Sequence, residues 1–268
     1  MSYLSVETED VYLTEGDDYI LRTESLLKKF GELRAVDGVS IRVKRKSLTA
    51  LIGPNGSGKT TLINTISGYY KPDGGRVYFK GKDITGLPPY EIYRHGLARS
   101  FQIPAAFIKL NVLENLLVAC RDNPGERILG HLIKKLWAKA EEDHIERAFK
   151  ILETLGIDDV WDKEAGALGA AQLKLLEVGR ALMSGAELVI LDEPIAGVNP
   201  SVATEIFSRL HDLRDKLGMT FFVIEHRIDI ALPYSDHVFV MNEGKLIYDG
   251  DPRRVTENEL VRVVYIGE

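Results

Sequence analysis

The chain has 268 residues, of which 45% are hydrophobic and 28% are charged, a balance typical of a globular protein that buries a full core. No apolar run approaches the roughly 20 residues of a membrane-spanning helix, and the first residues lack the basic and apolar regions of a signal peptide, so we expect neither. Cys120 is the only cysteine, which excludes an internal disulfide and fits a reducing compartment.

The net charge of −6 arises at the start of the chain. Residues 1–18 contain six acids and no Lys or Arg, whereas the whole chain has 40 acids and 34 bases. We therefore predict an acidic N-terminal arm over residues 1–18, either solvated or forming an edge strand. The remainder is neutral, and the absence of a basic surface excludes nucleic acid as an expected partner.

The segment after this arm is rich in β-type patterns. Residues 19–27, 36–43 and 77–80 have strand-like composition, and turn signals such as Asp73-Gly74-Gly75 separate them. We predict an antiparallel β subdomain in this part of the chain.

The most informative stretch is GPNGSGKTT, residues 53–61, which fits the pattern G-x-x-x-x-G-K-[ST]. An apolar strand is predicted before it at 48–52, and a helix after it at 61–66. Glycines let the backbone approach an anion, and the helix N-terminus directs N–H groups and partial positive charge toward phosphates. We predict a nucleoside triphosphate site rather than a glycine-rich turn with an accidental lysine.

Each position of this loop has an expected role. Lys59 is expected to reach the β- and γ-phosphates, and the Thr60 hydroxyl to complete a Mg²⁺ shell. The predicted nucleotide contacts are Gly53, Pro54, Asn55, Gly56, Ser57, Gly58, Lys59, Thr60 and Thr61.

After Pro88-Pro89 the periodicity becomes helical, from about residue 90 to residue 156. Its apolar stripes, at 129–136 and 145–152, are more typical of packing faces than of binding faces. The α/β pattern then returns, with helices predicted at 173–183 and 201–217, strands at 188–191 and 220–224, and a hairpin of 237–241 with 245–248. We predict an α/β fold: a P-loop nucleotide-binding core with an antiparallel β subdomain and an inserted helical subdomain at about 90–180.

Acidic residues follow the predicted strand at 188–191. Because ligands collect at the carboxyl ends of parallel strands, Asp192 is expected to hold Mg²⁺ through its water shell. Glu193 is expected to orient and deprotonate an attacking water. The next predicted strand ends in Glu225-His226, and His226 could donate to the γ-phosphate from the side opposite Lys59. From the residues alone, a purely structural histidine stays open.

Taken together, these motifs resemble the ATP-binding cassette (ABC) ATPases over residues 19–268, with GPNGSGKT matching the Walker A motif and LVILDE the Walker B motif. The resemblance implies that Gln102, in ARSFQIP, contacts Mg²⁺ and the attacking water and senses the membrane partner. It also implies that His226, in VIEHR, is the switch histidine and that Phe30 stacks on adenine. On physical grounds alone, Phe30 could equally be a core residue.

Among cassettes, the chain is most similar to the larger ATPase subunit of branched-chain amino-acid importers, through ARSFQ, GRALM, DEPIAGVNP, IEHR and VVYIGE. This resemblance implies ATP and Mg²⁺ as cofactors and two partners: a second ABC ATPase subunit, in a homo- or heterodimer, and transmembrane permease subunits. It also implies a peripheral position on the cytoplasmic face of the cell membrane. Ile103, Pro104 and Phe107 are candidates for the wall of a groove that receives the permease.

The chain departs from its family at the signature LSGGQ, where it has LGAAQ. The resemblance implies that this loop caps the γ-phosphate of ATP bound to the opposite subunit, through Gly169, Ala170, Ala171 and Gln172. Gly169 lacks the serine hydroxyl, and a positive φ at either alanine would cost about 1–2 kcal/mol. We expect weaker ATP-driven closure, at the site that this chain completes for its partner. Asn199, where many cassettes have aspartate, keeps the hydrogen-bonding reach and drops the charge.

There are three alternative classes. An ATP-gated dimerisation module with little hydrolysis is favoured by LGAAQ and disfavoured by Glu193 and His226. A cassette that acts on DNA or ribosomes is disfavoured, because such proteins usually have two cassettes or a long coiled coil and a basic face. A P-loop kinase is disfavoured, because nothing in this sequence resembles its acceptor-binding lid. We therefore predict an ATP-hydrolysing subunit that powers a membrane importer, with branched-chain or related amino acids as its solute.

Overall fold

The computed structural model describes residues 18–100, 106–121 and 134–266. The acidic arm up to residue 17, Gln102, Ile103, Pro104 and residues 129–133 of the first helical stripe lie outside the described residues. Within the described part, no helix is long and apolar enough to cross a bilayer.

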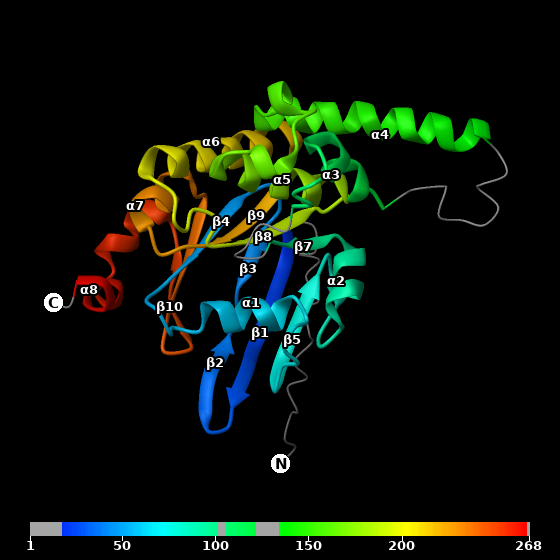
Figure 1. Ribbon diagram of the computed structural model, residues 1–268. Helices are drawn as coiled ribbons and strands as arrows, with labels where there is room; N and C mark the ends of the chain where they lie inside the picture. Colours follow the sequence, from blue (N-terminus) through cyan, green and yellow to red (C-terminus); the bar gives the residue numbers. More distant parts are fainter. Residues whose placement is uncertain (1–17, 101–105, 122–133, 267–268) are drawn as a thin grey trace, which may run out of the picture.

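An antiparallel sheet occupies the lower part of the molecule (Figure 1). In it β1 pairs with β2, β3 and β5, and β5 also pairs with β6. The strands are β1 (Tyr19–Phe30), β2 (Leu33–Val39), β3 (Arg42–Lys44), β5 (Gly74–Phe79) and β6 (Lys82–Asp83).

The prediction of one strand over residues 36–43 is wrong, because two strands occur there: β2 ends at Val39 and β3 begins at Arg42. The break lies opposite Thr23, whose hydroxyl donates to the Val39 carbonyl and accepts from the Ile41 N–H, each at 3.0 Å. A side chain thus replaces part of the ladder between the two short strands.

A second, mostly parallel sheet forms the centre, in the order β11-β10-β4-β9-β8-β7. Its strands are β4 (Leu48–Ile52), β7 (Leu97–Arg99), β8 (Leu188–Asp192), β9 (Thr220–Ile224), β10 (His237–Asn242) and the antiparallel edge strand β11 (Lys245–Gly250). Every residue of β4, β8 and β9 is buried, which explains their continuous apolar sequences. The strand β7 was missed in the stretch predicted as helical, because three residues show no periodicity.

Helices cover both faces of the central sheet. On one face α1 (Lys59–Ile66) lies between the two sheets and shares a core with both (Figure 1). The opposite face shares one apolar core with four helices: α3 (Val112–Val118), α4 (Lys134–Leu155), α5 (Ala170–Met183) and α6 (Pro200–Leu217).

Shorter elements complete the structure. The helix α2 (Pro89–His95) leads into β7, and a third apolar cluster joins β4 and β10 to the C-terminal segment. The remaining helices are α7 (Ile228–Ala231) and α8 (Glu259–Ile266), and the 3₁₀ segments are η3 (Asp158–Val160), η4 (Ala165–Ala167), η5 (Leu232–Tyr234) and η6 (Pro252–Glu257).

Candidate functional site

The glycine-rich loop between β4 and α1 is shaped by contacts with its own protein. Gly58 caps α1 at φ 101°, and a Cβ there would lie 2.2 Å from the Ala35 carbonyl oxygen. Gly53 has φ 153°, and a Cβ there would lie 2.2 Å from the Met241 carbonyl oxygen. Glycine is therefore required at both positions by neighbouring backbone, besides the approach of an anion that the sequence suggested.

The turn between β10 and β11 supports this loop from one side. The Gly244 N–H donates to the Ser57 carbonyl at 3.0 Å, and the Gly244 carbonyl accepts from the Asp37 N–H at 2.8 Å. Three segments far apart in the sequence are thereby fixed to one another beside the loop.

Lys59 is almost completely buried at the start of α1. Its Nζ donates to the carbonyls of Gly53 at 2.7 Å and Pro54 at 2.9 Å. Burial lowers the pKa of Lys59, while the negative charges of Glu193 and Asp192 act in the opposite direction. Phosphate oxygens are stronger acceptors than the two carbonyls, because their hydrogen bonds to an ammonium group are assisted by charge on both sides.

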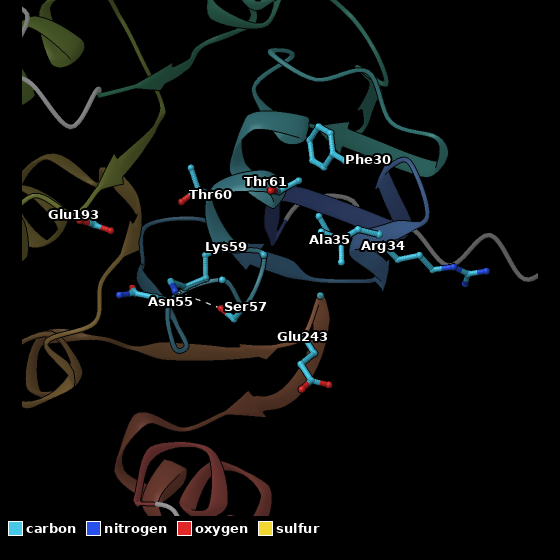
Figure 2. Close-up of a pocket in the computed structure, with 14 residues that line it drawn as sticks. Phe30, Arg34, Ala35, Asn55, Ser57, Lys59, Thr60, Thr61, Glu193 and Glu243 are labelled. Atoms are coloured by element: carbon cyan, nitrogen blue, oxygen red, sulfur yellow. Dashed lines mark hydrogen bonds between the residues drawn. The ribbon is translucent and has the colours of Figure 1, made fainter.

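A pocket of about 580 Å³ opens over this loop (Figure 2). Glu193 lies across the pocket from Lys59 and Thr60, and Phe30 lies beyond Thr61 at the end of β1. The lining residues are Phe30, Leu33, Arg34, Ala35, Asn55, Gly56, Ser57, Gly58, Lys59, Thr60, Thr61, Glu193, Glu243 and Gly244. The volume of the pocket suits a nucleotide. So does the order of the side chains along it, which runs from an aromatic ring to a lysine and then to a carboxylate.

Phe30 is 45% exposed, so it is not a core residue. Its ring meets Tyr70 edge-on, with centroids 5.3 Å apart and planes at 82°. Lys28 Nζ lies 5.5 Å from the ring centroid. The ring is thus oriented by two neighbours at the pocket wall, where it can stack on a planar base.

Asp192, at the end of β8, is paired with an arginine that the sequence analysis did not single out. Arg99 on β7 donates to Asp192 Oδ2 at 2.9 Å, and both side chains are nearly buried. The same guanidinium also bonds to Asn64 and Ser67 on and just after α1. Arg99 therefore connects the Walker B strand to the helix that follows the glycine-rich loop. Nothing in ARSFQ alone indicates this, since the partners are distant in sequence.

Glu193 and His226 come together at the edge of the pocket. Glu193 Oε2 lies 3.4 Å from His226 Nε2, although His226 is not among the lining residues. Glu193 has a positive φ of 49°, a conformation that non-glycine residues adopt mainly where the surroundings impose it. A bond from its N–H to the Ile224 carbonyl, at 3.0 Å, is part of that constraint.

Glu225 is a second residue that the sequence analysis did not assign. It follows β9, which lies between β4 and β8, and its side chain is buried. Burial raises the pKa of Glu225 to about 7, aided by the charge of Glu193. Hydrogen bonds from the backbone N–H groups of Ile195, His226 and Arg227 oppose this rise in pKa.

The LGAAQ stretch lines a separate hollow of about 450 Å³, which shares no residue with the pocket over the glycine-rich loop. Its lining residues are Gly169, Ala170, Ala171, Gln172, Gly197, Val198, Asn199, Val202 and Glu205. Within one subunit, then, the two predicted groups of nucleotide contacts lie apart. This separation fits a loop that acts on the nucleotide of another subunit.

The possible backbone strain at the two alanines does not occur. Gly169 precedes α5 with φ −70°, and Ala170 and Ala171 are its first residues, so the helix begins earlier than predicted. Gln172 Oε1 accepts from the Gly169 N–H at 3.2 Å. Asn199 caps α6, where its Oδ1 accepts from the Val202 N–H at 3.0 Å. The loss of charge at Asn199 leaves this cap intact.

A glycine-rich loop that faces a carboxylate across a nucleotide-sized pocket defines a P-loop ATPase. The chain belongs to the ABC transporter family, whose model matches residues 36–196. It is an ATP-binding subunit of a transporter, and such subunits hydrolyse ATP.

Relatives and a solved structure cover nearly the whole chain. The probable branched-chain amino acid transport ATP-binding protein LivG of Archaeoglobus fulgidus is 50% identical, over 92% of this chain and 95% of that protein. The protein of the same name from Methanocaldococcus jannaschii is 49% identical, over 93% of this chain and 98% of that protein. The crystal structure of an ATP-binding cassette of an ABC transporter, in its ADP conformation, has a TM-score of 0.80 and 48% identity, covering 93% of this chain and 99% of that one. The predicted family, the ABC ATPase fold and the transporter function are confirmed.

Proposed function

We propose that this ATPase powers the import of branched-chain or related amino acids. The observation that carries the ATPase part is the pocket that Lys59 and Glu193 line from opposite sides (Figure 2). The solute class is supported by the two relatives at 50% and 49% identity, both named for branched-chain amino acid transport.

Side chains in and beside the pocket have separate roles in hydrolysis. Lys59 exchanges its loop carbonyls for phosphate oxygens and neutralises the charge that develops on the transferred group. Glu193 orients a water molecule and accepts its proton. His226 lies 3.4 Å from Glu193 and donates to the γ-phosphate. Phe30 stacks on the base, and we retain Gln102 as the residue that senses the permease.

Mg²⁺ fits this site as an ion shared with the nucleotide. The described residues contain no group of three or more His, Cys, Asp or Glu side chains that could hold a metal ion by themselves. Mg²⁺ commonly takes one or two protein oxygens and completes its shell with phosphate and water, and Thr60 and Asp192 supply such oxygens. With Gln102, these would be its protein ligands. When bound, the ion would neutralise charge on the phosphates.

A second cassette completes each site. The hollow at LGAAQ presents the N-terminus of α5, with the backbone N–H groups of Ala170 and Ala171 as donors to a phosphate of the partner's ATP. Gly169, Ala170, Ala171 and Gln172 are therefore retained as nucleotide contacts across the dimer. The missing serine hydroxyl weakens this contact, and a partner with an intact signature would leave the site over Lys59 fully equipped.

The permease would dock beside α2 and α3, in the helical subdomain that we place at about residues 90–180. Phe107, Ile108 and Tyr93 are exposed there. Arg180 lies 4.8 Å from the ring centroid of Phe107, and Arg121 lies 3.7 Å from that of Tyr93. A surface of aromatic rings and arginines suits a short amphipathic permease segment. This contact would hold the subunit on the cytoplasmic face of the membrane.

The alternative, an ATP-gated dimerisation module that hydrolyses little ATP, has less support. Its basis was the altered signature, but the backbone at that loop is unstrained and the pair Glu193–His226 is assembled.

The test is solute uptake by the intact transporter. The chain would be purified from its own membranes with its associated subunits and reconstituted in vesicles with ATP on the cassette side. We expect uptake of radiolabelled leucine that competes with valine and isoleucine and that stops with Glu193→Gln. ATP-dependent uptake of another solute with no leucine uptake would contradict the solute class and leave the ATPase assignment standing.

A further inference from the structure

Glu225 is a buried acid with no role in the hydrolysis scheme above. It follows β9, the strand between the one that leads to the glycine-rich loop and the one that ends in Asp192. Only 1% of the residue is exposed. A carboxyl group in such a place needs hydrogen-bond donors, and their identity indicates what the group does.

The two carboxyl oxygens of Glu225 bond to different loops. Oε1 accepts from the Ile195 N–H at 3.1 Å, in the loop that follows Glu193. Oε2 accepts from the His226 N–H at 3.3 Å. One side chain therefore joins the backbone of the loop after β8 to the backbone of the loop after β9.

These two loops carry the Glu193–His226 pair. Its side chains are 21% and 42% exposed, so packing alone does not fix them. Their 3.4 Å separation depends on where the two loops lie, and Glu193 also keeps a left-handed backbone that needs support from its surroundings. The hydrogen bond from the Ile195 N–H to Glu225 lies two residues beyond Glu193 and restrains that stretch of backbone.

We propose that Glu225 is a positioning residue for hydrolysis: it sets the distance between Glu193 and His226 through the backbone of their loops. This inference rests on the proposed roles of those two residues. Glu225 does not line the pocket, so its loss acts on the chemical step and leaves nucleotide binding unchanged. Small displacements of groups that act on the reacting atoms have large effects on rate.

The test compares Glu225→Gln with Thr220→Val in the transporter complex purified with its own subunits. A glutamine keeps one acceptor oxygen and turns an NH₂ group toward the other N–H, so one of the two loops is released. Thr220 is a matched control at the opposite end of β9: it is buried, and its hydroxyl accepts one backbone bond, from Lys46 N–H at 2.9 Å. For Glu225→Gln we expect single-turnover hydrolysis to fall about tenfold while ATP affinity stays within about twofold, and for Thr220→Val neither to change.

A double-mutant cycle separates positioning from general destabilisation. In a His226→Ala background the Glu225→Gln effect on hydrolysis should shrink below about twofold, because the pair no longer exists. Hydrogen exchange gives an independent readout: the amides of Ile195 and His226 should exchange faster in Glu225→Gln, while those of β9 do not.

Each outcome decides the matter. Equal loss of hydrolysis in both backgrounds, unchanged exchange at Ile195 and His226, or full activity of Glu225→Gln would overturn the inference. Absence of ATP hydrolysis by the wild-type complex would instead overturn the proposed function.

Discussion

The pocket over the P-loop and the hollow at the LGAAQ loop, which we propose contact ATP from opposite subunits of a dimer, are built differently. In the pocket, Gly53 and Gly58 have backbones that only glycine adopts easily, with carbonyl oxygens at 2.2 Å from any added Cβ. In the hollow, Gly169 and the two alanines have ordinary extended and helical backbones. Substitution of Gly53 or Gly58 would disturb the fold, whereas substitution of Gly169, Ala170 or Ala171 mainly changes what the surface offers to a ligand. This difference explains how the chain departs from its family at one site and keeps the other.

The largest expected difference is catalytic. Glu193→Gln should lower ATP turnover by about 10²–10⁴-fold with ATP binding retained, because it removes the general base and keeps the shape. Glu205→Gln, at the hollow, should cost less than about fivefold, the size of an exposed charge's contribution. Steady-state hydrolysis and equilibrium ATP binding measure both. Similar turnover for the wild type and Glu193→Gln would mean that the pocket does not hold the base.

The second difference is in stability. Gly58→Ala should lower the free energy of unfolding by about 3 kcal/mol, from the clash with the Ala35 carbonyl and from the positive φ. Gly56→Ala, with a positive φ and open space, isolates the φ contribution at about 1–2 kcal/mol. Gly169→Ala should cost no more than about 1 kcal/mol, since the nearest atom lies 3.8 Å away. Urea unfolding of the three variants provides the ranking, and equal losses at Gly58 and Gly169 would remove the distinction.

The third difference concerns how stability depends on pH. The loops beside the pocket bury a titratable side chain, that of Glu225. Its folded-state pKa of about 7 lies above the usual value of 4.5, so the folded state binds the proton more tightly than the unfolded state. The stability from this group is complete below about pH 4.5 and is lost as pH rises toward 7, on the order of 2 kcal/mol between pH 5 and pH 7.5. The unfolding free energy of the wild type should fall relative to Glu225→Gln over that interval. Parallel pH curves for the two proteins would show that the acid is not perturbed.

The smallest expected stability change comes from rebuilding the signature. Gly169→Ser with Ala170→Gly and Ala171→Gly should lower the free energy of unfolding by about 1 kcal/mol, since glycine is the poorer helix former. The same change should raise ATP turnover about tenfold if the serine restores one charge-assisted hydrogen bond. Turnover that does not rise in a homodimer would place the limiting step elsewhere than the hollow.

The sequence predicted the parts of the site that are local. The P-loop and the acids after β8 were found because their spacing is fixed along the chain and strands and helices flank them. Arg99 and Glu225 were not assigned, because their function depends on partners such as Asp192 and Ile195 that only the sheet order brings near. The sequence showed that the LGAAQ loop differs from the family signature, but only the structure gives the φ angles of that loop.

The same reasoning applies to the fold. Buried strands such as Leu188–Asp192 were predicted closely, because a continuous apolar run between helices allows few other structures. The three-residue strand Leu97–Arg99 was not, since it is stabilised by its neighbour β8 and not by its own pattern. The interruption between Val39 and Arg42 depends on one threonine hydroxyl across the sheet.

The neighbours of β4 have a consequence for biosynthesis. This strand, which leads into the P-loop, pairs on one side with β9 and on the other with β10, and the turn that supports Ser57 follows β10. A ribosome makes β4 long before any of these segments, so the nascent chain carries an apolar strand with two unpaired edges. We therefore expect nucleotide binding to become available only after residues 237–250 have emerged, so that ATP would not act as a folding template for the first half of the chain.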